Sequence, residues 1–149
     1  MDSTFIRALF NAFIQGGGAV GPHTYVQLPD TAAGTTTTAG AGAAYGAYAQ
    51  IVASSAADYW LVGVHMAVST VGEAVQVNIA TGAAASETVR VSIPYIREVI
   101  TAVGEVIGVT YALPFPLRIP SATRIACRAR SATNATINVH VILATGLVA

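Results

Sequence analysis

Apolar and polar side chains alternate along most of the chain from Tyr45 onward, with a repeat of two residues. Such alternation is typical of β-strands that turn one face to a core and the other to solvent. The expected strands are residues 49–54, 59–69, 73–80, 88–93, 104–112, 123–130 and 136–143. Turn-rich joints separate them, and seven or eight strands at this spacing predict an antiparallel β-sandwich.

The second expected strand carries large apolar side chains at every other position. Trp60, Val62, Val64, Met66 and Val68 share one parity. Alternate residues of a strand face the same way, so we expect Trp60 to belong to the core.

Residues 94–103 (PYIREVITAV) are ambiguous. Their spacing allows a helical turn or two. Pro94 and the β-branched residues, however, favour a long loop or a segment that crosses between sheets.

Residues 3–15 have a helical repeat instead. Their large apolar side chains recur at i, i+1, i+4, i+5, i+8 and i+9, which gathers them on about half of a helix circumference. They are Phe5, Ile6, Leu9, Phe10, Phe13 and Ile14. Asp2 or Ser3 suits the N-cap, and Gly16–Gly18 ends the helix and removes any fixed angle between it and the rest of the chain. The pattern predicts a short N-terminal amphipathic helix on a glycine swivel.

Between this helix and the alternating region lies a stretch of small residues. Residues 29–44 (PDTAAGTTTTAGAGAA) have the low complexity of a spacer without core-forming side chains. The short alternating piece Thr24–Leu28 suits one additional strand. We therefore divide the chain into an N-terminal anchor, residues 1–44, and a β-sandwich domain, residues 45–149.

Charge is scarce in this chain. Charged residues make up 9% of it and apolar residues 54%, and seven arginines balance seven acidic residues to a net charge of zero. A free monomer of this composition would be poorly soluble, so we expect other subunits to cover much of its surface. Zero net charge argues against binding to nucleic acid or to an anionic membrane surface, because both require a cationic field. No clean apolar run of about 18 residues predicts a transmembrane helix.

Three of the seven arginines share one face of an expected strand. Arg124, Arg128 and Arg130 have the same parity. A guanidinium binds a carboxylate through two parallel hydrogen bonds, so this row predicts ion pairs at a subunit interface. A solvated outer sheet face is the alternative. Tyr45 and Tyr48 are further candidates for interface contacts.

Other chemistry receives little support from the sequence. His65 and His140 share the outward parity of their strands, but no spacing typical of a metal site accompanies them, so we expect no metal and no cofactor. The single cysteine, Cys127, has the apolar parity of its strand and is expected to be a small buried hydrophobe. Without a nucleophile motif or a carboxylate pair, we expect no enzyme activity.

Two stretches resemble small jelly-roll virion proteins of tailed bacteriophages. LPFPLRIPSATRIACRARSATNATINVHVILA (113–144) has the extended proline-marked lead-in, turn, strand, polar loop and final alternating strand of that family. DYWLVGVHMAVSTVGEAVQVNIATGAAASETVRVSIP (58–94) resembles the preceding hairpins. The family pattern has a glycine in the turn where Ser121, Ala122 and Thr123 stand. The resemblance implies an all-β, antiparallel jelly-roll-like sandwich of about eight strands. It also implies an accessory virion protein, commonly trimeric, that decorates or cements a head or forms the base or knob of a short fibre.

With that resemblance, the N-terminal helix has a candidate role. A closed sandwich needs no detached helix for its core, so we expect Phe5, Leu9, Phe10 and Phe13 to dock into an apolar groove of another virion protein. Each fully buried Phe or Leu contributes about 1.5–3 kcal/mol. Packing of the helix back onto its own sandwich is the alternative.

The function expected from the sequence is structural. We expect a capsid decoration or cement protein of a tailed phage, located at the capsid surface, homotrimeric, and bound to the major capsid protein or another virion protein. A receptor- or glycan-binding fibre knob and a tail-associated structural protein remain open. A membrane-active helix ranks below them, because its polar face carries one charge, Arg7.

Overall fold

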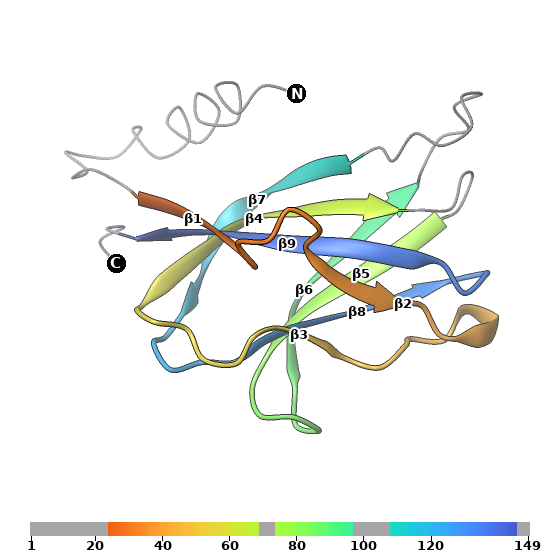
Figure 1. Cartoon of the computed structure of the whole chain (residues 1–149), viewed down its shortest axis with the longest axis horizontal. Coiled ribbons are helices and arrows are strands. Elements are labelled where there is room, and N and C mark those ends of the chain that lie inside the picture. The colour runs from red at the N-terminus through yellow and green to blue at the C-terminus, as the bar shows by residue number, and fades with distance from the viewer. Residues whose placement is uncertain (1–23, 69–73, 97–107, 146–149) are drawn as a thin grey trace.

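The computed structural model describes residues 24–68, 74–96 and 108–145. These residues form a sandwich of two antiparallel sheets (Figure 1). The predicted antiparallel sandwich is therefore confirmed. The expected helix at residues 3–15, with Phe5, Ile6, Leu9, Phe10, Phe13 and Ile14, lies outside the described residues. Within the described ranges, no helix is long and apolar enough to cross a membrane.

The first sheet contains the strands β1 (Thr24–Leu28), β2 (Thr35–Thr38), β4 (Tyr59–Val68), β7 (Gly108–Ile119) and β9 (Thr136–Thr145). Its order is β1-β9-β4-β7, and β2 pairs with β9 alongside β1. The second sheet contains β3 (Ala49–Val52), β5 (Ala74–Thr81), β6 (Thr88–Ile96) and β8 (Ile125–Ser131), in the order β3-β8-β5-β6. A short 3₁₀ turn, η2 (Ala41–Ala43), precedes β3.

Most of the expected strands are present, with ends shifted by a few residues. Two differences involve whole segments. Residues 113–119, expected as an extended lead-in, continue β7. The expected spacer contains β2, which pairs with β9, and Thr37 in it is 3% exposed. Threonine has a high β propensity, so a four-threonine run can complete a sheet edge without large apolar side chains.

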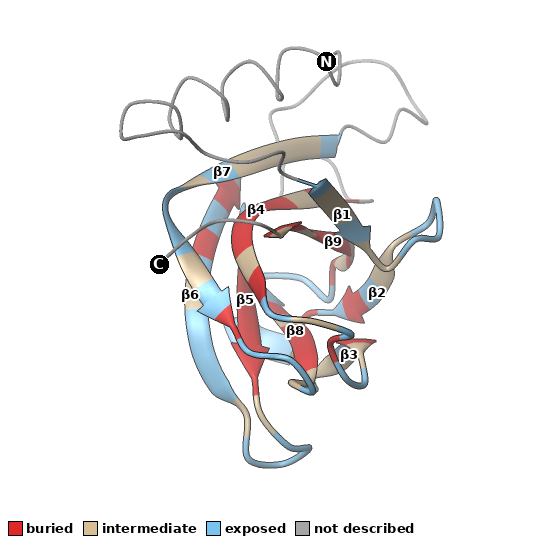
Figure 2. Ribbon diagram, turned by 90° about the vertical axis from the view of Figure 1, so that its left-hand side faces the viewer, coloured by how far each residue is buried: buried red, intermediate tan, exposed pale blue. Residues whose placement is uncertain are grey.

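The core lies between the sheets and follows the alternation of the central strands. In Figure 2 the buried residues run along β4, β5 and β8, whereas β6 is mostly exposed. Val77 and Ile79 of β5 face Ile137, Val139 and Val141 of β9 in one cluster. Cys127 belongs to this cluster, and burial raises the pKa of its thiol to about 12. The expectation that Cys127 is a small buried hydrophobe is confirmed.

A bulge in β4 corrects the expected position of Trp60. The register of β4 against both β7 and β9 shifts between Leu61 and Gly63. The extra residue reverses the parity of the strand. Leu61 and Val64 therefore both face the main core, whereas Trp60 and Val62 belong to a second apolar cluster with Tyr25, Ile142 and Ala144.

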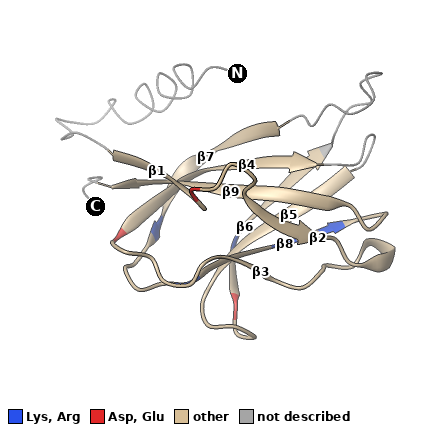
Figure 3. Cartoon of the chain, viewed as in Figure 1, with Lys and Arg blue, Asp and Glu red and all other residues tan. Residues whose placement is uncertain are grey.

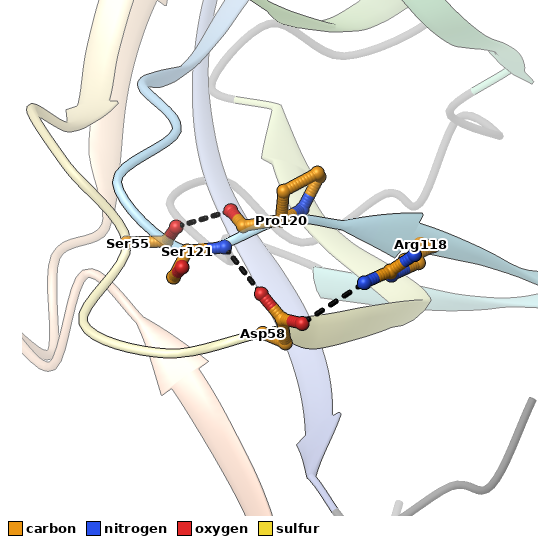
Figure 4. Close-up of polar contacts among 5 residues, drawn as sticks. All are labelled: Ser55, Asp58, Arg118, Pro120 and Ser121. Atoms are coloured by element: carbon orange, nitrogen blue, oxygen red, sulfur yellow. Dashed lines mark hydrogen bonds and ion pairs between the residues drawn. The ribbon is translucent and has the colours of Figure 1, made fainter.

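The turn that leads from β7 into β8 is held against the loop between β3 and β4. The Asp58 carboxylate accepts hydrogen bonds from the Ser121 N–H at 2.7 Å and from Arg118 Nη2 at 3.0 Å (Figure 4). Ser55 is buried, and its hydroxyl donates to the Pro120 carbonyl at 2.7 Å. Ala122, in the turn where the family pattern has glycine, has a left-handed φ of 57°. This network fixes where β8 begins.

Candidate functional site

The candidate site lies on the outer face of the second sheet, at the end of β8. Basic residues are visible there in Figure 3, on elements that otherwise carry few charges. Arg128 and Arg130 point to this face because the alternate residues Cys127 and Ala129 are in the core. In register on β5, Asn78 lies opposite Arg128 and Gln76 lies opposite Arg130.

Residues 40–48 run beside the free edge of this half of β8. The Gly46 N–H donates to the Ala129 carbonyl at 2.8 Å, and Gly40 forms a bridge with Arg130. A Cβ atom at position 46 would lie 1.9 Å from the Thr38 carbonyl oxygen. Only glycine allows this close approach, which brings Tyr45 and Tyr48 over the sheet face.

The two tyrosine rings enclose the Arg128 guanidinium. Its carbon lies 4.4 Å from the Tyr45 ring centroid and 4.5 Å from that of Tyr48. The Arg130 guanidinium lies 5.1 Å from the Tyr45 ring. These are cation–π distances, and the contacts fix the arginine side chains. We call Tyr45, Tyr48, Arg128 and Arg130 the arginine–tyrosine surface.

Polar neighbours on β5 and β6 hold Tyr45 in place. The single proton of its hydroxyl is shared between Gln76 Oε1 at 2.9 Å and Asn78 Oδ1 at 3.2 Å. The Ser92 hydroxyl on β6 also donates to Asn78 Oδ1, at 2.7 Å. The ring therefore has a fixed orientation over both arginines.

Arg124 has a different environment from the two arginines with which the sequence grouped it. Its Nη1 donates to Glu87 Oε1 at 2.8 Å, and its Nε donates to Gln50 Oε1 at 3.2 Å. The side chains of Arg124 and Glu87 are 15% and 6% exposed. Desolvation alone would raise the pKa of Glu87, but backbone N–H donors and Arg124 outweigh it, so this pKa lies below its ordinary value. Glu87 lies at the end of the turn between β5 and β6, and this turn brings it to Arg124.

The structure thus brings together four of the five residues expected at an interface. Tyr45, Tyr48, Arg128 and Arg130 are in contact, whereas Arg124 lies at the other end of β8 in its own ion pair. Sequence reasoning did not identify Gln76, Asn78 and Ser92 as supporting residues. Their outward parity was the available signal, but it is shared by many solvent-exposed polar residues.

A second group of polar residues lies on the outer face of the first sheet. His65 and His140 are opposite each other in β4 and β9, with ring centroids 5.8 Å apart. Burial and the charge of His140 lower the pKa of His65. His140 Nε2 donates to the Thr31 carbonyl at 2.9 Å. In the described part of the chain, no three His, Cys, Asp or Glu side chains are grouped to hold a metal ion.

Comparisons with known proteins give limited information. No protein-family model matches the chain, and no curated protein matches it. Among solved structures, it is similar to a chain in a structure of infectious bursal disease virus, Gx strain, with a TM-score of 0.41 and 14% sequence identity. The match covers 86% of this chain and 32% of the viral chain, so this chain spans about a third of that protein's length.

Proposed function

We propose that this chain is a structural virion protein of a tailed phage, and that it decorates or cements the capsid surface. In this proposal it forms a homotrimer through its β-sandwich and attaches to the major capsid protein or another virion protein through its N-terminal segment. The proposal assigns it neither enzyme activity nor a cofactor.

The observation that carries the proposal is the order of the strands. One sheet is β1-β9-β4-β7 and the other is β3-β8-β5-β6. Along the chain, β3 lies in the second sheet, β4 in the first, β5 and β6 in the second, β7 in the first, β8 in the second and β9 in the first. The chain therefore crosses between the two sheets in the manner of a jelly roll. Jelly rolls occur in viral capsid proteins and lectins.

Between a capsid-type structural role and a lectin-type binding role, the composition supports the structural one. The chain is 54% apolar and 9% charged, so contacts with other subunits would improve its solubility. The resemblance of residues 58–94 and 113–144 to phage virion proteins agrees with this role. A fold alone does not define a function, so the location of the protein must be tested directly.

Electron microscopy of intact particles, with the protein labelled by an antibody, tests the location. We expect label on the capsid surface, and light scattering of the purified protein should give three times the chain mass of 15.2 kDa. Deletion of residues 1–18 should abolish particle binding while the sandwich stays folded. Label on the tail would support the tail-associated alternative, and absence from particles would contradict the proposal.

A further inference from the structure

Arg128 and Arg130 differ from two other arginines in having no carboxylate partner among the residues that the structure describes. Arg118 pairs with Asp58 and Arg124 pairs with Glu87, whereas neither Arg128 nor Arg130 has an ion pair in the described residues. The Nε of Arg128 is buried and has no acceptor among those residues. Among the described residues, the outer face of the second sheet therefore presents two guanidiniums that no described carboxylate neutralises.

The geometry of the arginine–tyrosine surface determines what kind of anion fits. Rings at 4.4 Å and 4.5 Å fix the Arg128 guanidinium, so its terminal amino groups are oriented before a ligand arrives. A planar guanidinium matches the two oxygens of a carboxylate. Because the side chain is already ordered, binding loses less conformational entropy than it would with a mobile arginine. Arg130, on the same face and over the same Tyr45 ring, supplies a second positive charge.

The neighbours of this surface are polar. Gln76 and Ser92 lie beside the two arginines and offer an amide group and a hydroxyl group, whereas Asn78 is 3% exposed and already accepts from Tyr45 and Ser92. In the described residues, the large hydrophobic side chains that are exposed are Val89 and Phe115, and Phe115 is on β7 in the other sheet. A stable protein interface has an apolar centre with exposed aromatic or aliphatic anchors, whereas the aromatic rings of this face, Tyr45 and Tyr48, lie against the arginine guanidiniums. Clustered hydrogen-bonding groups suit a ligand rich in hydroxyls.

We propose that the arginine–tyrosine surface binds an acidic saccharide through its carboxylate. Arg128 and Arg130 bind the carboxylate oxygens, and Gln76 and Ser92 contact the sugar hydroxyls. Tyr45 is a positioning residue, because its hydroxyl bonds to Gln76 and Asn78 orient the ring against which both arginines lie. This site is independent of attachment to a particle.

Calorimetric titration of the full chain with trigalacturonic acid tests this proposal, with maltotriose as the neutral comparison. We expect binding of the acidic trisaccharide that weakens as salt is raised, and no binding of maltotriose. Arg130→Ala should weaken binding about tenfold or more, because it removes a charged hydrogen bond. Arg128→Lys should also weaken it, because an ammonium group keeps the charge but lacks the planar pair of donors.

Arg118→Ala is the matched control. This arginine is exposed and paired with Asp58 on the other sheet, so its removal should leave saccharide affinity unchanged. Thermal unfolding of each variant shows whether the fold is retained. Equal binding of maltotriose, or no binding of the acidic trisaccharide, would overturn the proposal. So would equal affinity for a glutamate tripeptide, which would indicate an acidic protein partner. Dissociation of an oligomer in Arg130→Ala, seen by light scattering, would assign the surface to a second copy of the chain instead.

Discussion

Arginines lie at both ends of β8, but their surroundings differ. Arg124, directly before the strand, marks its first end, and Arg128 and Arg130 lie toward its second end. At the first end, Arg124 donates to Glu87 and Gln50, and the preceding turn is bonded to Ser55 and Asp58. At the other end, Arg128 and Arg130 lie against tyrosine rings, and no carboxylate of the described residues pairs with them. The difference arises from the neighbouring segments, because the β5–β6 turn brings an acid to Arg124, whereas residues 40–48 bring aromatic rings. Arg124 therefore forms an ion pair within the fold, whereas Arg128 and Arg130 are the residues to which we assign ligand binding.

Removing the guanidinium at the first end should have the largest effect on stability. Arg124→Ala leaves Glu87 without its partner and should lower the free energy of unfolding by more than the loss of either outer-face arginine. Urea denaturation measures this. Arg130→Ala is the control, with an expected change within about 0.5 kcal/mol because its side chain is exposed. Equal losses in the two variants would remove the distinction between the two ends.

A smaller change at the second end tests whether Tyr45 is held in place. Tyr45→Phe removes the hydroxyl that bonds to Gln76 and Asn78, and it should cost about 1 kcal/mol of unfolding free energy. Tyr48→Phe is the matched control, since the Tyr48 ring contacts the same guanidinium without a hydroxyl bond of this kind in the described residues. An equal loss in both variants would show that the Tyr45 hydroxyl does not orient the ring.

The turn at the start of β8 offers a stabilising substitution. Ala122 has a φ of 57°, a conformation that glycine adopts without steric cost, so Ala122→Gly should raise stability by about 0.5–1 kcal/mol. Ala132→Gly, in a turn without a positive φ, should instead lower it slightly. Differential scanning calorimetry compares the two melting temperatures. A fall in the melting temperature of Ala122→Gly would contradict the proposed backbone strain.

Acid should act more strongly on the first end than on the second. The pKa of Glu87 in the folded chain lies below its ordinary value of 4.5, so its contribution to stability is present above that pH and is lost as pH falls through the folded pKa. Urea midpoints measured from neutral pH into this range should therefore fall. Glu87→Gln should show a shallower fall, whereas Arg130→Ala should keep the full dependence. An unchanged slope in Glu87→Gln would contradict this assignment.

The fold was largely predictable because strand alternation is a local property. The strands around Val77, Val91 and Ile137 were all expected from the repeat of two. Trp60 was misplaced because a one-residue bulge in β4 reverses the parity, and nothing in the local pattern marks it. The pairing of β2 with β9 was missed for a related reason: four threonines show no alternation of polarity.

The candidate site was only partly predictable. Parity correctly placed Arg128 and Arg130 on one face, and Tyr45 and Tyr48 were identified as contact residues. Their contact with the arginines depends on residues 40–48 running beside β8, about eighty positions later in the chain. For the same reason, sequence could not pair Arg124 with Glu87 rather than with another acid. Such non-local pairings follow from topology, which a single sequence does not display.

The pairing of β1 and β2 with β9 has a consequence for the time at which the sandwich can close. Thr24 lies opposite Thr145, so the first described strand finds its neighbour only after more than a hundred further residues have been synthesised. Until then, the backbone donors and acceptors of residues 24–38 have no sheet to join. Protection of these amides from hydrogen exchange should therefore appear late in refolding, after that of the β5–β6 hairpin, whose partners are close in sequence.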